Sequence, residues 1–392
     1  MERLRVAVFS DSAFPILNGV SVSVDALVRE MRNRGHSVHQ YSPRFPGHQD
    51  ADPNTYRFRS VILPFWPGYP LAIPPYYRQL QKFRRRDYDV IHTHTPFILG
   101  MVGLRWAESE EIPIVATYHT LYDRYSHYIR FSPRRYMRYR IAKHTNFYFN
   151  RVDRVITPTE ASLRWLRRHS VETPTDVIPT ASPRPPILER AETRHALNIP
   201  PEARVLLYVG RLAEEKNLET LVDAAALAFK ADPALRLHLV GDGPHREALV
   251  SRVRRLGIGD RVRFVGFVPR EEVDRHYATA DLFFFASISE TQGLAVQEAM
   301  LHGLPAVAVT GGGVTEAIED GVDGYLVHND PRELASAALQ VLHDDASHAR
   351  MSEAASRGAR SYGIPEMAER VENTYRMAIA ARLGKEQHVS LR

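Results

Sequence analysis

Short apolar runs alternate with amphipathic stretches along the whole chain. The run Leu4–Phe9 precedes a helical pattern over Val20–Arg34, and the next strand begins shortly afterwards at Ser37. Further strand-like runs in this half are Val90–His92, Ile114–Thr117 and Arg154–Thr157. Strands separated by helices of about 10 to 15 residues are typical of βαβ units, in which the strands pair in parallel.

The same alternation begins again in the second half. Its strand-like runs are Val205–Val209, Leu235–Val240, Val262–Val265, Leu282–Phe285, Ala306–Val309 and Gly324–Val327. Two such sets in series predict an α/β protein with two Rossmann-like, doubly wound domains. We assign residues 1–180 to the first domain, 181–203 to a proline-rich linker, 204–363 to the second domain, and 364–392 to a C-terminal helix and tail long enough to cross back to the first domain.

The composition narrows the class of protein. No stretch approaches the ~18 uninterrupted apolar residues of a membrane-spanning helix. The N-terminus enters a strand directly, without the apolar core of a signal peptide, and we therefore expect a cytoplasmic protein. The chain has no cysteine, which excludes disulfides, zinc–thiolate sites, iron–sulfur clusters and cysteine nucleophiles.

Positive charge is concentrated in the first half. Residues 1–180 contain 26 Lys and Arg against 16 Asp and Glu, whereas the remaining residues contain 25 against 30. Between Arg124 and Arg154, nine basic residues accompany a single acid, Asp153. Such asymmetry indicates nucleic acid, an anionic membrane or a phosphorylated substrate as partner, or else a solvated basic face.

The clearest candidate chemistry follows two strands of the second domain, because doubly wound folds bind ligands beyond the carboxyl ends of their strands. After the first of these strands, G-R-L-A-E-E-K-N places Arg211 and Lys216 where two cations can hold a diphosphate. Downstream, A-S-I-S-E-T-Q-G-L-A-V-Q-E-A-M places Glu290 before Gly293, and Glu298 in the helix that follows. The two carboxylates can accept hydrogen bonds from sugar hydroxyls, while helix N–H groups between them face phosphate.

Weaker patterns suggest other chemistry. Gly19, which opens the first helix, can bring a backbone N–H to an anion. D-Y-D at residues 87–89 reads as a metal-binding D-x-D, and His92, His94 and His119 suggest zinc. Because the phosphate-binding groups here are Arg, Lys and helix N-termini, we expect no metal and interpret these histidines as packed strand ends. No G-x-G-x-x-G follows the first strand, which disfavours an oxidoreductase.

Several motifs together carry a family resemblance over nearly the whole chain. They include T-Y-H-T around His119, G-R-x-x-x-x-K-N, L-V-G-D-G-P, F-x-G-F-V, E-x7-E and T-G-G-G-V-T-E-A-I-E-D-G. The chain resembles the retaining family 4 glycosyltransferases of the GT-B fold, in which two Rossmann-like domains face each other across a cleft. H-T-H-T-P-F at His92–Phe97, T-Y-H-T-L-Y-D-R-Y-S-H-Y-I at Thr117–Ile129 and S-E-T-Q-G-L at Ser289–Leu294 make it most similar to bacterial diacylglycerol α-glucosyltransferases.

The resemblance implies a role for each matched position. Arg211 and Lys216 would hold the diphosphate and stabilise the charge that builds as UDP leaves, and Glu290 would hold the hydroxyls of the donor sugar. His119, the fourth catalytic residue by resemblance, would orient that sugar. The remaining donor contacts would be Gly19, Gly241, Phe267, Val268, Gln292, Gly293, Leu294 and Glu298, with Glu298 on the ribose and Phe267 and Val268 beside the base.

The basic segment acquires a meaning from this resemblance. Around residues 128–144, arginines are interleaved with aromatic and apolar residues, a combination that suits an anionic membrane surface. The predicted membrane and acceptor residues are Arg130, Arg134, Arg135, Arg138, Arg164, Trp165 and Arg168. A merely solvated face and nucleic-acid binding remain the alternatives.

The sequence thus predicts a monomeric, metal-independent retaining hexosyltransferase without a cofactor. It would transfer glucose from UDP-glucose to diacylglycerol while bound peripherally to the inner face of the cell membrane. The alternatives within this class are UDP-galactose as donor, or transfer of mannose from GDP-mannose to a phosphoinositide. The alternative from another class is a non-catalytic nucleic-acid-binding protein.

Overall fold

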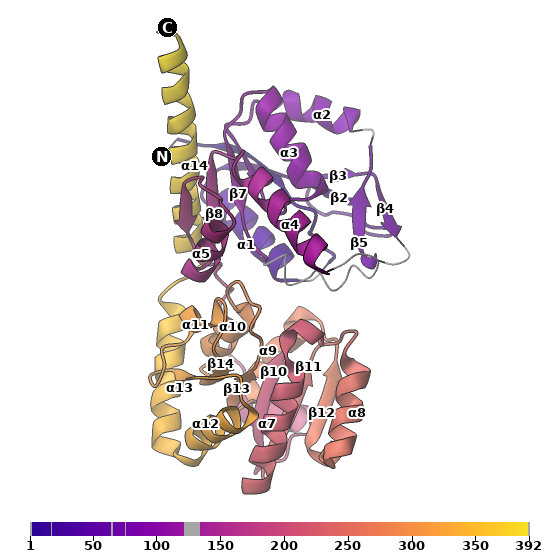
Figure 1. Ribbon diagram of the computed structural model, residues 1–392, viewed down its shortest axis with the longest axis vertical. Coiled ribbons are helices and arrows are strands. Elements are labelled where there is room, and N and C mark those ends of the chain that lie inside the picture. Colours follow the sequence, from indigo (N-terminus) through magenta and orange to yellow (C-terminus); the bar gives the residue numbers. More distant parts are fainter. Residues whose placement is uncertain (1, 17, 64–65, 75, 121–133, 391–392) are drawn as a thin grey trace. The chain divides into compact units, whose positions relative to one another are not determined.

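The computed structural model describes residues 2–16, 18–63, 66–74, 76–120 and 134–390, without the side chains at 63, 66–69, 134, 138 and 385–390. The chain divides into two compact units, which are considered separately below (Figure 1). Unit 1 comprises Met1–Ala181 together with Gly363–Arg392, and unit 2 comprises Ser182–Tyr362. Every strand-like run named from the sequence is a strand in the structure, which confirms two Rossmann-like domains.

Unit 1 is built on a parallel sheet with the strand order β3-β2-β1-β6-β7-β8-β9. The strands are β1(Arg5–Phe9), β2(Ser37–Pro43), β3(Thr55–Phe58), β6(Val90–Thr93), β7(Ile114–Thr117), β8(Arg154–Thr157) and β9(Thr175–Val177). β4(Ser60–Leu63) and β5(Trp66–Ala72) form a separate antiparallel pair. The central strands are buried and apolar, as expected when helices cover both faces of a parallel sheet.

The helices of unit 1 include one from the far end of the chain. They are α1(Gly19–Asn33), α2(Tyr77–Arg84), α3(Ile98–Ser109), α4(Arg134–Phe149), α5(Glu160–Arg168) and α14(Ile364–Ser390). α14 packs on α1 and on β6, β7 and β8 of the first domain (Figure 1, yellow), as the length of the C-terminal helical pattern suggested. Glu372 of α14 is buried and pairs with Arg34 at 3.1 Å and with Arg376 at 2.6 Å. Burial would raise the pKa of Glu372, but hydrogen bonds from Arg376, Arg34 and His36 outweigh it and lower that pKa.

Unit 2 has a six-stranded parallel sheet with the order β12-β11-β10-β13-β14-β15. The strands are β10(Arg204–Val209), β11(Leu235–Val240), β12(Val262–Gly266), β13(Leu282–Phe285), β14(Ala306–Val309) and β15(Gly324–Val327). The helices are α6(Arg190–Ala196), α7(Leu218–Ala231), α8(Arg246–Leu256), α9(Arg270–Thr279), α10(Leu294–Leu301), α11(Val314–Ala317), α12(Pro331–His343) and α13(Asp345–Arg360), with short 3₁₀ turns at Glu214–Lys216 and Gly259–Arg261.

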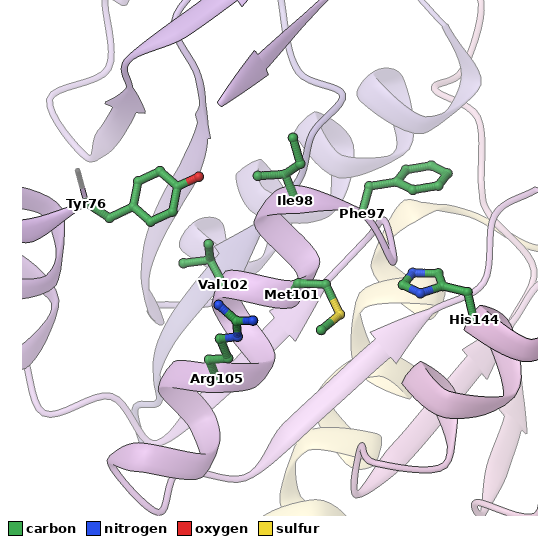
Figure 2. A pocket seen from close by; sticks show the side chains of 7 residues that line it. All are labelled: Tyr76, Phe97, Ile98, Met101, Val102, Arg105 and His144. Carbon is green, nitrogen blue, oxygen red and sulfur yellow. The ribbon is translucent and has the colours of Figure 1, made fainter. Parts of the chain in front are cut away.

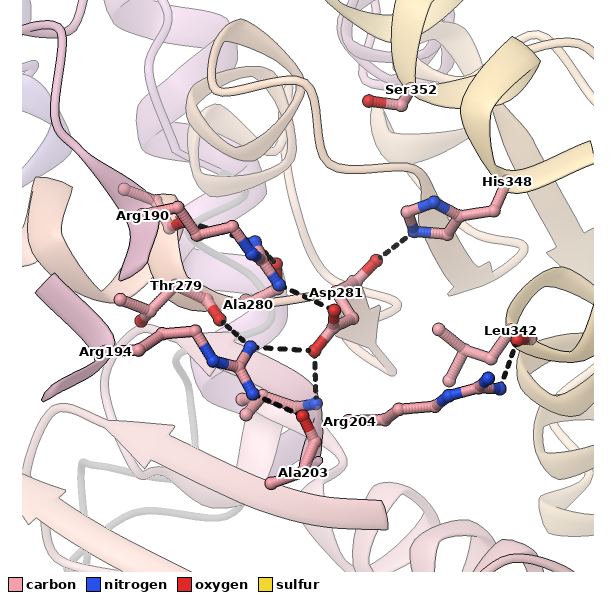
Figure 3. Close-up of polar contacts among 12 residues, drawn as sticks. Arg190, Arg194, Ala203, Arg204, Thr279, Ala280, Asp281, Leu342, His348 and Ser352 are labelled. Atoms are coloured by element: carbon pink, nitrogen blue, oxygen red, sulfur yellow. Dashed lines mark hydrogen bonds and ion pairs between the residues drawn. The ribbon is translucent and has the colours of Figure 1, made fainter. Parts of the chain in front are cut away.

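The sequence suggested residues 181–203 as a linker. In the structure, 182–203 of this segment belong to unit 2. Figure 3 shows the reason: the carboxylate of Asp281, just before β13, accepts hydrogen bonds from two arginines of α6. Arg190 Nη2 donates to Asp281 Oδ1 at 2.6 Å, and Arg194 Nη1 donates to the Thr279 carbonyl at 2.9 Å and to Asp281 Oδ2 at 3.4 Å. Proline content therefore indicated a segment without strands, but arginine contacts with distant residues make it part of the domain.

Within the described ranges, no helix is both long and apolar enough to span a membrane.

Candidate functional site

The predicted donor residues of unit 2 gather at one edge of its sheet. The strand order reverses between β10 and β13, and this topological switch point is where doubly wound sheets bind ligands. The segment after β10 carries Arg211 and Lys216, and the segment after β13 carries Glu290. Because β10 and β13 are parallel neighbours, both segments leave the sheet at the same edge.

Lys216 and Glu290 form a close ion pair at this switch point. Lys216 Nζ lies 2.6 Å from Glu290 Oε1, and the two side chains are only 14% and 18% exposed. Burial alone would raise the pKa of Glu290, but the charge and hydrogen bond of Lys216 outweigh burial and hold that pKa below its usual value. The site therefore keeps a buried carboxylate ionised beside a buried cation.

Close approaches between glycines shape the loop that carries Arg211. A Cβ added to Gly241 would lie 2.0 Å from the Gly210 carbonyl oxygen, and one added to Gly243 would lie 2.3 Å from the Leu212 oxygen. Leu212 N also donates to the Asp242 carbonyl at 3.0 Å. G-D-G at residues 241–243 therefore holds the loop after β10 by backbone contact, and the exposed Arg211 side chain extends from that loop.

A second glycine run supports the loop that carries Glu290, a role that the sequence motif alone did not reveal. Gly313 N donates to the Glu290 carbonyl at 2.9 Å. A Cβ on Gly312 would lie 2.3 Å from that same oxygen, and a Cβ on Gly313 would lie 2.0 Å from the Thr291 oxygen. The glycines of T-G-G-G thus allow their backbone to touch the backbone of the loop that carries Glu290.

α10 begins at this same loop. Gly293 has φ +88°, a conformation that other residues rarely adopt, and serves as the N-cap. Gln292 is buried, and Leu294 is the first helical residue. The first N–H groups of a helix have no intrahelical acceptor and favour an anion. The structure thus places the predicted phosphate-binding backbone directly after Glu290.

Glu298 lies one turn further along α10 and is held by α9. Arg270 Nη1 lies 2.8 Å from Glu298 Oε1, and the Tyr277 hydroxyl donates to Oε2 at 3.1 Å. A carboxylate offers about four lone-pair sites, so Glu298 keeps capacity for the ribose hydroxyls predicted for it. After β12, Phe267 is 68% exposed and Val268 packs partly against the core, so Phe267 has a free ring face for a base.

In unit 1, the corresponding switch point lies between β1 and β6. Asp11, which sequence reasoning missed, follows β1 and accepts a hydrogen bond from Thr95 Oγ1 at 2.6 Å and one from Leu99 N at 3.1 Å. Burial raises the pKa of Asp11 to about 6, a perturbation typical of functional carboxylates. Its position directly after a strand was the available signal. The predicted Gly19 is exposed at the start of α1, after the N-cap Asn18.

His119 is partly buried and belongs to a cluster of histidines in unit 1, in which His92 and His94 are buried. Its Nε2 lies 2.9 Å from His94 Nδ1. His92 Nδ1 lies 2.7 Å from the Tyr375 hydroxyl of α14, and His92 Nε2 lies 2.7 Å from Thr117 Oγ1. These contacts support the interpretation of the histidines as packed strand ends, and they show that α14 takes part in the packing.

The histidine cluster makes stability depend on pH. Burial lowers the pKa of His92 to about 3 and that of His119 to about 4, whereas both titrate near ~6.5 in the unfolded chain. The unfolded state therefore binds more protons below pH ~6.5, and folded stability is lost as the pH falls from there toward 4. We expect the thermal unfolding midpoint to drop between pH 7 and pH 5, and the drop to be smaller in His92→Gln.

The control for this prediction is His328→Gln, since His328 is 85% exposed. The raised pKa of Asp11 makes stability change with pH in the opposite direction. This contribution is the same in the wild type, His92→Gln and His328→Gln, so it cancels when their unfolding midpoints are compared. An equal drop in the unfolding midpoint between pH 7 and pH 5 for the wild type and His92→Gln would contradict the assignment of His92 as a buried neutral imidazole.

The D-x-D aspartates have a structural partner. Asp89 Oδ1 lies 2.9 Å from Arg5 Nη2, and Asp87 Oδ2 lies 3.7 Å from Arg5 Nη1. Among the side chains described, no group of three or more His, Asp and Glu is arranged to hold a metal ion.

The predicted membrane residues are only partly described. Arg135, Arg164 and Arg168 are exposed. Arg130 lies outside the described residues, as do the side chains of Arg134 and Arg138, although the backbone of these two belongs to α4.

Trp165, a member of the predicted membrane set, packs against other aromatic rings of unit 1. Its indole stacks on His169 at a ring separation of 3.8 Å and on Tyr118 at 5.3 Å. Both stacking partners belong to unit 1, and a role of Trp165 at a membrane stays a prediction.

The fold and the residues at the switch point of unit 2 together define a class of enzyme. Two Rossmann-like units, one with a largely buried Lys–Glu pair, an arginine loop and a helix N-terminus at its switch point, fit the GT-B fold of glycosyltransferases. Family models agree: "Glycosyltransferase Family 4" matches residues 17–181, and "Glycosyl transferases group 1" matches residues 189–358. The chain belongs to this glycosyltransferase family.

Individual relatives and one solved structure are similar to this chain over most of its length. The α-monoglucosyldiacylglycerol synthase of Streptococcus pneumoniae is 31% identical, over 86% of this chain and 78% of that protein. The synthase of the same name from Acholeplasma laidlawii is 28% identical over 95% and 96%. A GDP-mannose-dependent α-mannosyltransferase of Corynebacterium glutamicum is also 28% identical, over 91% and 85%. Among solved structures, sucrose-phosphate synthase from Thermosynechococcus elongatus superposes with a TM-score of 0.79 at 25% identity, over 97% and 100%.

Proposed function

We propose that the protein is a retaining, metal-independent glucosyltransferase that transfers glucose from UDP-glucose to diacylglycerol. The observation that carries the proposal is the Lys216–Glu290 pair at the switch point of unit 2. A nucleotide diphosphate needs cations there, and a sugar needs a fixed acceptor for its hydroxyls. The similarity to two α-monoglucosyldiacylglycerol synthases supports glucose and diacylglycerol as the substrates.

The proposed chemistry uses charge and position rather than a protein nucleophile. The acceptor hydroxyl oxygen bonds to the anomeric carbon from the face that the phosphate leaves, as the bond to the UDP oxygen breaks. The hydroxyl proton passes to a phosphate oxygen, so UDP is released and the α configuration is retained. Lys216, Arg211 and the N-terminus of α10 stabilise the charge on the leaving diphosphate. Glu290 holds the sugar and Glu298 the ribose, whereas donor contacts of Gly19 and His119, which lie in unit 1, stay a prediction.

The second candidate is transfer of mannose from GDP-mannose, and the Corynebacterium relative favours it. The two candidates share the same cationic switch point and differ in the base and in the sugar. Membership of the glycosyltransferase family favours either of them over a non-catalytic nucleic-acid-binding protein.

The testing experiment measures nucleoside diphosphate release from UDP-glucose, UDP-galactose and GDP-mannose. Each donor is supplied with vesicles that contain or lack diacylglycerol and phosphatidylglycerol. We expect UDP release from UDP-glucose that requires diacylglycerol, with an α-linked glucolipid as product. Turnover with another donor alone would replace the substrate assignment, and silence with all three would overturn the proposal.

We further propose that the enzyme works as a peripheral protein on the inner face of the cell membrane, through the exposed arginines of α4 and α5. Near an anionic surface each basic residue contributes ~1 kcal/mol. We therefore expect Arg135→Glu with Arg168→Glu to lower vesicle binding and diacylglycerol-dependent turnover by more than tenfold at low salt. Arg254→Glu with Arg255→Glu changes the charge equally on the exposed end of α8 in unit 2 and is the matched control. Equal losses in the two double variants would contradict the location of the membrane surface.

A further inference from the structure

An open pocket lies in unit 1 beside α3. Its volume is about 370 Å³, within the ~300–1,000 Å³ range of small-molecule sites. Figure 2 shows that successive turns of α3 supply one wall of the pocket. Tyr76, which precedes α2, and His144, which belongs to α4, come from other segments. Besides Arg105, the residues that line this α3 pocket are Tyr76, Phe97, Ile98, Met101, Val102 and His144.

The lining suits a hydrocarbon rather than a sugar or a nucleotide. It is mostly aliphatic and aromatic, and it includes no carboxylate. Its polar atoms are partly engaged: His144 Nε2 lies 2.6 Å from the Pro96 oxygen, and the Tyr76 hydroxyl donates to the Ala72 oxygen at 3.3 Å. The charged side chain in the lining is that of Arg105, and the described residues provide no ion-pair partner for it.

The surroundings of the α3 pocket match a negatively charged bilayer surface. Phe97 at the pocket is 47% exposed, and Tyr139 of α4 is 60% exposed. The exposed Arg140 and Lys143 of α4 precede the pocket residue His144. Exposed aromatic rings beside cations are typical of protein surfaces that lie in the membrane interface. A bilayer would therefore meet this face through both apolar contact and charge complementarity.

The pocket also lies close to the switch point of unit 1. Ile98 lines the pocket, and the next residue, Leu99, donates its N–H to the Asp11 carboxylate at 3.1 Å. A lipid whose chain occupies the pocket thus has its polar end near the strand edge where doubly wound domains bind ligands.

We propose that the α3 pocket binds one acyl chain of the diacylglycerol acceptor. This inference rests on the function proposed above, because it assigns the place where that acceptor is held. Burying methylene groups against Ile98, Met101 and Val102 supplies affinity in proportion to chain length. The enzyme should therefore distinguish acceptors by the length of their acyl chains as well as by their hydroxyl group.

The kinetic test compares dioleoylglycerol with dibutyrylglycerol as acceptors. In Met101→Trp, whose indole fills the pocket, we expect the ratio of kcat/KM for the long-chain over the short-chain acceptor to fall at least tenfold. Met101→Gln, which makes the lining polar at nearly constant size, should lower the ratio in the same direction and covers the case in which the tryptophan variant folds poorly. Met377→Trp, at an exposed methionine of α14, is the matched control and should keep the wild-type ratio.

A binding test separates this inference from the proposed function. A diacylglycerol with a diazirine at the end of one acyl chain is placed in phosphatidylglycerol vesicles and photolysed with the full-length protein. Labelling of the peptide Ile98–Ser109, reduced in Met101→Trp, supports the pocket. Labelling there without any glucose transfer would overturn the proposed function and keep the acyl site. Glucose transfer with an unchanged chain-length ratio and labelling elsewhere would overturn the acyl site and keep the function.

Discussion

Lys216→Ala is expected to lower glycosyl transfer by about 10²- to 10³-fold, the usual cost of losing one group that stabilises a developing negative charge. The same substitution leaves Glu290 without its partner at 2.6 Å in a largely buried position. Removing one member of a buried pair typically costs ~3–5 kcal/mol, so the thermal unfolding midpoint should fall as well. Steady-state kinetics and a thermal melt on the same preparation measure the two effects.

A double substitution separates catalysis from stability. Adding Glu290→Gln to Lys216→Ala removes the uncompensated charge, so we expect part of the lost unfolding midpoint to return while glycosyl transfer stays at the reduced level or lower. Lys230→Ala, at an exposed lysine of α7, is the matched control and should change neither quantity. If the double variant regained activity, Lys216 would be a structural partner of Glu290 and not a group that binds the diphosphate.

Gly313→Ala is expected to have the second large effect, because it acts on the loop that carries Glu290. The added Cβ would lie 2.0 Å from the Thr291 carbonyl oxygen and 2.4 Å from its carbon, so the backbone of one segment must move. Overpacking of this kind costs ~1–3 kcal/mol. We expect kcat/KM for the donor to fall at least tenfold, with a lower unfolding midpoint.

The matched substitution is Gly259→Ala, where no atom lies within 4 Å of the added Cβ. It should change stability by no more than ~0.5 kcal/mol, the range of ordinary surface substitutions, and leave kcat/KM unchanged. If Gly313→Ala kept the wild-type kcat/KM for the donor, the loop that carries Glu290 could move without consequence. That loop would then not be part of the donor site.

Much of the fold could be predicted because the signals are local. β10, for example, is an apolar run followed by glycine, and α7 follows it with buried residues at helical spacing. The positions of Lys216 and Glu290 followed from a topological rule about strand ends rather than from their contact. The ion pair between them, across 74 positions of sequence, required the parallel pairing of β10 with β13.

Other features gave no local signal. The sequence suggested residues 181–203 as a linker because prolines interrupt any periodic pattern, yet Arg194 within this segment donates hydrogen bonds to Thr279 and Asp281, far along the chain. Trp165 lies beside two arginines in the sequence, which gives no hint that its ring stacks on Tyr118 from a different segment. The α3 pocket combines residues from the segment before α2, from α3 and from α4, which no window of sequence places together.

The sequence by itself determined two parallel α/β domains, the absence of cysteine chemistry, the basic N-terminal half and the loops that carry the donor residues. These properties depend on composition and on periodicity over about 10 to 15 residues, which neighbouring side chains set. Tertiary structure alone decided the Lys216–Glu290 contact, the histidine cluster under α14 and the raised pKa of Asp11. Each of these depends on which distant residues exclude water from a polar group, and only the packed chain determines that.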